Sequence, residues 1–324
     1  MNRFKDILFV AEPAGVDETA FRRALKLAQA HQARLAVIDV METVPAPFAS
    51  STWGMASAKL QQIIADERRE RLERLVASVT NEVQISIKLL TGCTFLEVIR
   101  EVLRNKHDLV VKSAEGSDVS GMGLFGGNDM HLLRKCPCPV LLMRPLKEEK
   151  FRSVVAAVDI DPEGAEGYEG ALNRQILEMA SGIALADLSE MHIVHAWEAF
   201  GENALRRSRD RFTDEEVDNY LTSEEQRHRI WLEELVDMVD KQQGDDVFEY
   251  IKPKLHLTKG RPREALPTLV SNLVADLIVM GTVARTGISG FFMGNTAEIV
   301  LHKIECSVLA IKPQGFVTPV TLEE

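Results

Sequence analysis

The chain contains the same pattern of residues twice. The stretch HDLVVKSAEG aligns with ADLIVMGTVA, and the later stretch RKCPCPVLLMRP aligns with HKIECSVLAIKP. The spacing is 168 residues throughout, both between Asp108 and Asp276 and between Pro145 and Pro313. Near the start of each copy, FKDILFVAE aligns with FRSVVAAVD at a spacing of 147, so the first half of the second copy is longer. An internal repeat of this length indicates two homologous domains rather than one large one.

We predict one domain over residues 1–147, a second over 148–316 and an acidic tail over 317–324. Each copy alternates short apolar runs with longer amphipathic segments. The runs that predict strands cover residues 6–11, 35–41, 83–90, 109–112 and 140–143 in the first copy, and 154–158, 191–197, 248–257, 277–281 and 308–311 in the second. The predicted fold is therefore α/β, with two tandem doubly wound domains whose five-stranded parallel sheets carry helices on both faces.

The last strand of each copy would be an apolar sheet edge. Val140–Met143 and Val308–Ile311 carry no charged residue, and an exposed edge of this kind is a liability unless another strand pairs with it. Ser223 and Gln226 predict the start of a helix in the second copy, after an irregular insertion over residues 199–222.

A glycine-spaced loop follows the strand that ends at Gly281. Its glycines include Gly294, and Asn295 with Glu298 has the spacing of a helix N-cap and its capping-box partner. The order strand, glycine loop, helix turns backbone N–H groups and the positive end of a helix toward one point, which suits a phosphate. Between residues 282 and 297 the only charged side chain is Arg285, a cation.

The spacing Gly281, two residues, Ala284, nine residues, Gly294, Asn295 resembles the nucleotide motif of the universal stress protein family, G-x2-G-x9-G-(S/T). The duplicated pattern is similar to the tandem, E-type members of that family. The resemblance implies a flavodoxin-like sandwich of the adenine nucleotide alpha hydrolase kind, with ATP over the strand ends. It also implies that the last strands of the two domains pair, so that the chain is an intramolecular pseudo-dimer. Whether two chains form a homodimer stays open.

The topology and the resemblance together give a candidate site in the second domain for ATP or a related adenine nucleotide, with or without Mg²⁺. Asp159 ends a strand that would face the same crevice as Gly281, and the resemblance assigns an acid there to the nucleoside end and the glycine loop to the phosphates. The Asn295 amide can donate to a phosphate or act only as a helix cap. The predicted cofactor-binding residues are Asp159, Met280, Gly281, Ala284, Arg285, Gly294, Asn295 and Thr296.

The corresponding loop of the first copy, SAEGSDVSGMGLFGGND, differs in charge. Ser113 replaces the first glycine of the motif, and the loop carries Glu115, Asp118 and Asp129 but no Lys or Arg. Each carboxylate would repel a triphosphate at close range. We therefore predict that the first domain does not bind ATP.

Composition excludes several classes of partner. The chain of 324 residues has a formal net charge of −11, whereas nucleic acids and anionic membranes require a basic face. No apolar run approaches the length of a membrane span, and Ile7–Ala11 is too short for the core of a signal peptide. We predict a cytoplasmic protein with no nucleic-acid or membrane partner.

The four cysteines, Cys93, Cys136, Cys138 and Cys306, fit a reducing compartment. Because Cys136 and Cys138 lack the two-residue spacer of a redox or zinc pair, we interpret these cysteines as small buried apolar side chains.

The sequence contains no P-loop, no kinase signature and no Ser/His/Asp arrangement. His192 and His195 lie three apart in a strand and so point to opposite faces, which excludes a shared metal. The leading hypothesis is a nucleotide-responsive stress protein with a regulatory or protective role and no dedicated catalysis. A slow ATPase is the second hypothesis. A scaffold or binder of another small ligand, with the insertions at 45–55 and 199–222 lining its cavity, is the third.

Overall fold

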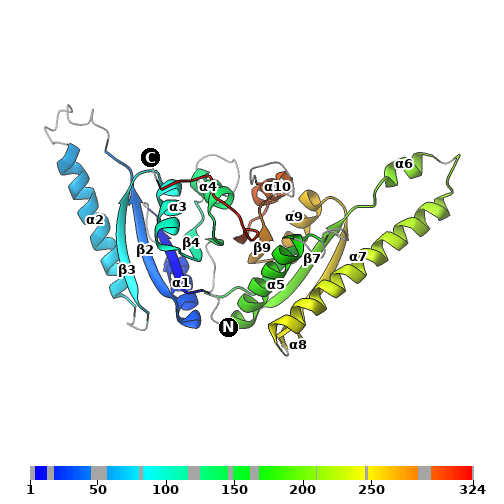
Figure 1. Cartoon of the computed structure of the whole chain (residues 1–324), viewed down its shortest axis with the longest axis horizontal. Helices are drawn as coiled ribbons and strands as arrows, with labels where there is room; N and C mark the ends of the chain where they lie inside the picture. Colours follow the sequence, from blue (N-terminus) through cyan, green and yellow to red (C-terminus); the bar gives the residue numbers. More distant parts are fainter. Residues whose placement is uncertain are drawn as a thin grey trace.

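A computed structural model of the chain describes residues 4–12, 18–44, 57–79, 83–115, 125–144, 149–160, 168–208, 210–244, 247–283 and 293–322. The described strands form one sheet in the order β3-β2-β1-β4-β5-β10-β9-β6-β7-β8 (Figure 1). The first copy contributes β1 (Asp6–Ala11), β2 (Arg34–Met41), β3 (Ile85–Thr91), β4 (Leu109–Ser113) and β5 (Val140–Met143). The second contributes β6 (Ser153–Val158), β7 (Glu190–Trp197), β8 (Lys254–Lys259), β9 (Leu277–Gly281) and β10 (Ser307–Ile311). The predicted α/β fold with two doubly wound halves is confirmed.

Within each copy all neighbouring strands are parallel and follow the order 3-2-1-4-5. The two halves meet where β5 and β10 run antiparallel, with Leu141 opposite Leu309. Each of these strands therefore covers the apolar edge of the other. The free edges of the sheet are β3 and β8, at opposite ends of the molecule.

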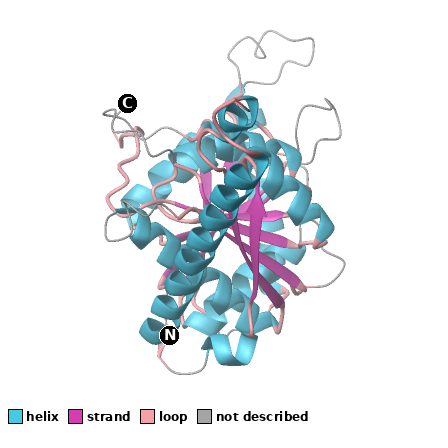
Figure 2. Cartoon of the chain, turned by 90° about the vertical axis from the view of Figure 1, so that its right-hand side faces the viewer, coloured by secondary structure: helices cyan, strands magenta, loops and turns pink. Residues whose placement is uncertain are grey.

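Helices cover both faces of the sheet (Figure 2). One face carries α1 (Glu18–His31), α2 (Ser57–Ala77), α5 (Tyr168–Asp187), α7 (Asp214–Gln243) and α8 (Val247–Ile251), whose apolar side chains join one core. The other carries α3 (Thr94–Asn105), α4 (Gly127–Lys135), α9 (Pro262–Asn272) and α10 (Asn295–Lys303), which join a second core. Both cores run through the two copies, because the sheet is continuous.

Three predicted boundaries in the second copy are wrong. The predicted third strand begins instead as the short helix α8, whose Phe248 packs into the core, and β8 starts only at Lys254. The insertion contains the short helix α6 (Glu202–Arg207), and α7 starts at Asp214 rather than near Ser223. The reason is a complete capping box earlier in the chain, in which the Thr213 side chain accepts from the Glu216 N–H and the Glu216 carboxylate accepts from the Thr213 N–H.

The segment after β10 crosses back to the first copy (Figure 1). Val320 packs against the core beneath α3, and Arg100 of α3 donates to the carbonyl oxygen of Thr321 at 3.3 Å. Residues predicted to form an acidic tail therefore contact α3 of the first copy. No helix among the described residues is long and apolar enough to cross a membrane.

Candidate functional site

The strand order of the second copy reverses at the neighbouring parallel strands β6 and β9, because the sheet continues to β7 on one side and to β10 on the other. Such a reversal opens a crevice beyond the carboxyl ends of the two strands. Asp159 directly follows β6, and Gly281 ends β9. A cavity of about 360 Å³ lies at this point.

The cavity brings together six of the eight predicted site residues. Asp159, Met280, Gly281, Gly294, Asn295 and Thr296 all line it. Ala284 and Arg285 lie outside the described residues. The remaining lining residues, mostly apolar, are Ala157, Val158, Leu172, Asn173, Ile176, Ala196, Pro262, Leu266, Val283, Ala297 and Pro313.

Asn173 of α5 fixes the chain at Asp159, and sequence reasoning missed it. Its side-chain oxygen accepts from the Asp159 N–H at 3.1 Å, and its amide nitrogen donates to the Asp159 carbonyl at 2.7 Å. Asn173 is buried, whereas Asp159 is exposed at the cavity rim. The two hydrogen bonds therefore fix the backbone of Asp159 at the end of β6, and neither of them uses the Asp159 carboxylate. A polar residue on an otherwise apolar helix stripe was the only signal for this role.

The N-terminus of α10 forms another wall of the cavity. Gly294 is the N-cap and Asn295 the first helical residue, so the predicted capping box of Asn295 and Glu298 is wrong. Glu298 instead forms an ion pair with Arg134 of α4. Because the N-cap residue is a glycine, it has no side chain that could accept from the first backbone N–H groups of α10. These groups and the positive end of the helix suit an anion.

The two ends of the glycine loop are tied together. Val283 and Met293 form an isolated antiparallel bridge, and the Gly294 N–H donates to the Thr282 carbonyl at 3.2 Å. The Thr282 hydroxyl in turn donates to the carbonyl of Leu133 in α4 at 3.1 Å. The base of the loop is thus anchored to the first copy.

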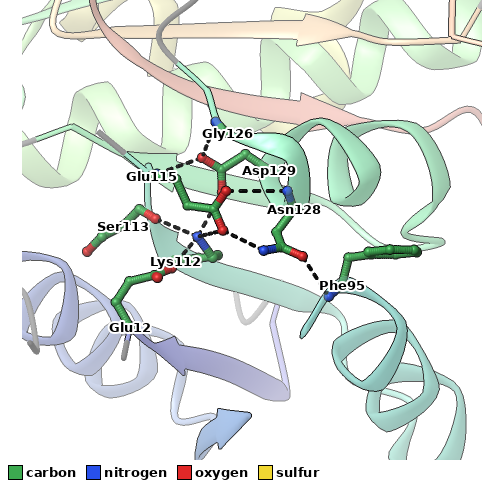
Figure 3. Close-up of polar contacts among 8 residues, drawn as sticks. All are labelled: Glu12, Phe95, Lys112, Ser113, Glu115, Gly126, Asn128 and Asp129. Carbon is green, nitrogen blue, oxygen red and sulfur yellow. Dashed lines mark hydrogen bonds and ion pairs between the residues drawn. The ribbon is translucent and has the colours of Figure 1, made fainter. Parts of the chain in front are cut away.

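The corresponding place in the first copy is filled by its own side chains (Figure 3). The repeat spacing puts Lys112 where the second copy has Met280, and Asp129 where it has Ala297. Lys112 Nζ donates to Asp129 Oδ1 at 2.8 Å and pairs with Glu12. Burial disfavours the ammonium, but Asp129, Glu12 and Glu115 outweigh it and raise the pKa of Lys112 above its ordinary value. Lys112 and Asp129 are fully buried, so the group is a charged core.

Two carboxylates of this cluster take the backbone N–H groups that a phosphate would need. Asp129 accepts from the N–H groups of Glu115 and Gly126, and Glu115 accepts from both the backbone and the side chain of Asn128. A Cβ atom at Gly126 would lie 1.9 Å from Glu115 Oε2, so the glycine makes room for that carboxylate. The loop over residues 113–129 itself carries no Lys or Arg, but Lys112 of the preceding strand supplies a cation that the sequence-based prediction did not consider.

The chain matches the universal stress protein family over residues 3–144 and again over 150–312. Universal stress protein E of Salmonella typhi is 30% identical over 332 residues, covering 100% of this chain and 99% of the relative. Universal stress protein E of Escherichia coli strain K12 is 31% identical over 333 residues, with coverage of 100% and 99%. A universal stress protein structure from Archaeoglobus fulgidus shares the fold, with a TM-score of 0.62, 16% identity, and coverage of 97% of this chain and 98% of that one. The chain therefore belongs to the universal stress protein family and carries two copies of its domain.

Proposed function

We propose that the second domain binds an adenine nucleotide such as ATP in the cavity at the ends of β6 and β9. The observation that carries the proposal is the convergence of six predicted residues, from β6, β9 and α10, on one cavity. A volume of about 360 Å³ lies within the range of small-molecule sites. The proposed domain boundaries are residues 1–147 for the first domain and 148–316 for the second, and residues 317–324 form the tail.

Each wall of the cavity offers chemistry that fits one part of the nucleotide. The apolar side chains of Ile176, Met280 and Leu266 suit the faces of a purine ring. The Asp159 carboxylate can accept hydrogen bonds from ribose hydroxyls. The start of α10, with the Asn295 and Thr296 side chains beside it, can donate to phosphate oxygens. Mg²⁺ would be held mainly through those phosphates and not by a cage of protein carboxylates.

We infer a regulatory or protective stress role, in which an occupied cavity holds the glycine loop against the domain. Among the described residues, Asp159 is the one ionisable side chain that lines the cavity, and Glu298 in the first turn of α10 is paired with Arg134, so binding without dedicated catalysis is preferred over a slow ATPase. Since most of the lining is apolar, another small ligand is the second candidate. We place the role in the cytoplasm, because all four cysteines are free thiols.

The paired strands β5 and β10 support a further part of the proposal. Their antiparallel contact relates the two domains through Leu141 and Leu309, which are equivalent residues of the repeat. We infer that the chain is the intramolecular counterpart of a dimer of single domains. In this pseudo-dimer the second domain has a nucleotide site and the first does not.

Titration calorimetry with ATP and Mg²⁺ tests the proposal. We expect the wild type to bind about one nucleotide per chain. Ala297→Asp should abolish binding, since it puts a carboxylate on the cavity wall at the place that Asp129 holds in the first copy. His302→Asp is the matched control, because it adds the same charge to an exposed position of α10 and should leave the affinity unchanged. No heat from the wild type, or equal binding by Ala297→Asp, contradicts the proposal.

A further inference from the structure

Two buried thiols lie side by side where α4 leads into β5. The Sγ atoms of Cys136 and Cys138 are 3.6 Å apart, with Pro137 between them in the sequence. Cys136 is fully buried, and Cys138 is 8% exposed. A disulfide bond is about 2.05 Å long, so a shift of roughly 1.6 Å would join the two sulfurs. The sequence spacing had argued against a redox pair, but the chain turn at the end of α4 brings these thiols into contact.

A buried lysine completes the group. Continuing the antiparallel register of β5 and β10 by two residues puts Lys312 opposite Cys138. Lys312 Nζ donates to the Thr282 hydroxyl at 2.5 Å and also to the carbonyl of Leu133. Its charge acts on Cys136, so a thiolate there would have a cation close by.

The electrostatics of the two thiols differ. Burial opposes ionisation of Cys136, but hydrogen bonds from the Cys138 thiol and backbone, together with Lys312, lower the pKa of Cys136 below its ordinary value. The pKa of Cys138 is raised, because its thiol donates to Cys136 and is itself buried. The pair therefore has one sulfur suited to attack and one suited to resolve the product.

A second cavity lies beside Lys312 and the two prolines that flank Cys138. It has a volume of about 300 Å³ and is lined by Pro137, Pro139, Lys312 and Phe316, among others. Pro137 and Pro139 flank Cys138 in the sequence. A hydroperoxide held there would lie beside Lys312, whereas neither cysteine lines the cavity.

We propose that Cys136 and Cys138 form an oxidant-sensitive dithiol that closes to an intrachain disulfide on reaction with a hydroperoxide. The Cys136 sulfur attacks the terminal peroxide oxygen, the O–O bond breaks, and the alkoxide or hydroxide leaves with a proton. The Cys138 sulfur then displaces the oxygen from the Cys136 sulfenic acid as water. In total, two thiols lose two electrons and two protons, and one hydroperoxide becomes one alcohol and one water. For hydrogen peroxide itself the products are two waters.

The second copy supplies an internal control. At the place of Cys138 it has Cys306, but at the place of Cys136 it has Ile304. Cys306 is buried without a second thiol at that place, and burial raises its pKa to about 12. The same fold thus presents one paired and one single thiol in equivalent positions.

Alkylation and mass spectrometry of the full-length protein test the proposal. After treatment with hydrogen peroxide, the chain is unfolded and alkylated with N-ethylmaleimide. We expect a loss of two hydrogen masses, two alkylated cysteines instead of four, and a tryptic peptide that holds Cys136 and Cys138 as a disulfide. Dithiothreitol should restore four alkylated cysteines. The disulfide should form at least about tenfold faster than any modification of Cys306.

Three variants sharpen the test. Lys312→Met should slow disulfide formation several-fold at pH 7 and below, where Lys312 is at least about half protonated, because the thiolate loses that cation. Cys138→Ser should leave Cys136 unable to form the intrachain bond, while Cys306→Ser should behave as the wild type. A disulfide to Cys93 or Cys306, or four alkylated cysteines after peroxide treatment, overturns the proposal, and both readouts need only the wild-type chain.

Discussion

Lys112 and Met280 occupy equivalent positions in the two copies, and the difference between them determines whether the strand end carries a charged cluster or a cavity. Met280 leaves a cavity at the end of β9. Lys112 instead brings three carboxylates together: Glu12, Glu115 and Asp129. Burial raises the pKa of both Glu12 and Asp129, so each carboxylate depends on the lysine for its charged form.

Replacement of Lys112 by Met should therefore destabilise the chain. The loss leaves the fully buried Asp129 without its cation, and breaking a buried ion pair costs about 3–5 kcal/mol. The triple variant Lys112→Met, Glu115→Val, Asp129→Ala copies the second domain and should recover most of that loss. Urea denaturation measures both. Equal stability of the single variant and the wild type would show that the cluster contributes nothing.

Lys312 gives the stability of the protein a pH dependence. Burial lowers the pKa of Lys312 to about 7, against about 10.4 in an unfolded chain. Between these values the unfolded chain binds a proton that the folded chain does not, so stability should rise with pH from about 7 upward. The limiting slope is about 1.4 kcal/mol per pH unit.

We expect the difference in unfolding free energy between the wild type and Lys312→Met to grow in favour of the wild type from pH 7 to pH 9. The exposed Lys303→Met serves as the control and should leave that slope unchanged. A wild-type advantage that is flat or falls with pH would mean that Lys312 stays charged in the folded chain.

At this scale the sequence predicted residues of the cavity lining where their place in an element indicated a role. Asp159, Gly281 and Thr296 were named because they follow a strand, end a strand and begin a helix, and all three line the cavity. Asn173, Lys112 and Lys312 were missed, because their roles come from partners that fold beside them and not from their neighbours in the sequence.

Among the elements, α7 shows how a local signal fixes a boundary. The helix has 30 residues, of which the first half extends beyond the sheet (Figure 1). Few described side chains of that half are buried; Val217 is the clearest case. Its stability must therefore come largely from the cap at Thr213.

Thr213→Ala should loosen the start of α7. Loss of an N-cap costs about 1 kcal/mol, which corresponds to a roughly fivefold faster amide exchange in the first turns. Hydrogen exchange with mass spectrometry over residues 214–222 measures this. Ser223→Ala is the matched control, since Ser223 lies inside the helix and is exposed. Similar exchange in the two variants would mean that Thr213 does not act as the cap.

Most elements could be predicted because the sequence patterns were strong; β6 and β9, for example, are short continuous apolar runs. The errors fall where short-range chemistry overrides the pattern. Phe248 belongs to an apolar run that suits a strand, but its N–H donates to the Asp240 carboxylate and the run folds as α8. Comparison with the first copy could not reveal this error. Phe248 lies in the part of the second copy where the spacing between the two copies changes from 147 to 168 residues.

For the whole molecule, a buried ion pair joins the two copies apart from the sheet. Arg23 of α1 donates to Asp187 of α5 at 2.7 Å, and both side chains are almost fully buried. The Asp187 carboxylate also accepts from the Phe151 N–H at 3.1 Å, and the Arg23 guanidinium lies over the Phe151 ring. Sequence patterns could not predict this contact, because the residues are far apart in the chain and belong to different copies.

Asp187→Ala should therefore lower the unfolding free energy of the whole chain by about 3–5 kcal/mol, because it leaves Arg23 buried without its anion. The exposed pair of Arg22 and Glu149 is the control, and Glu149→Ala should cost less than about 1 kcal/mol. Guanidinium denaturation of the two variants compares them. If Asp187→Ala costs no more than Glu149→Ala, the pair does not hold the copies together.

The position of a bound adenine nucleotide is the central question for the molecule. In crystals grown with ATP and Mg²⁺, we predict one nucleotide per chain, with its ribose beside Asp159 and its phosphates at the start of α10. The cluster around Lys112 should keep the contacts that it has in Figure 3. A nucleotide bound in the first domain in place of that cluster, or a second-domain cavity that stays empty at saturating ATP, would contradict the proposed function.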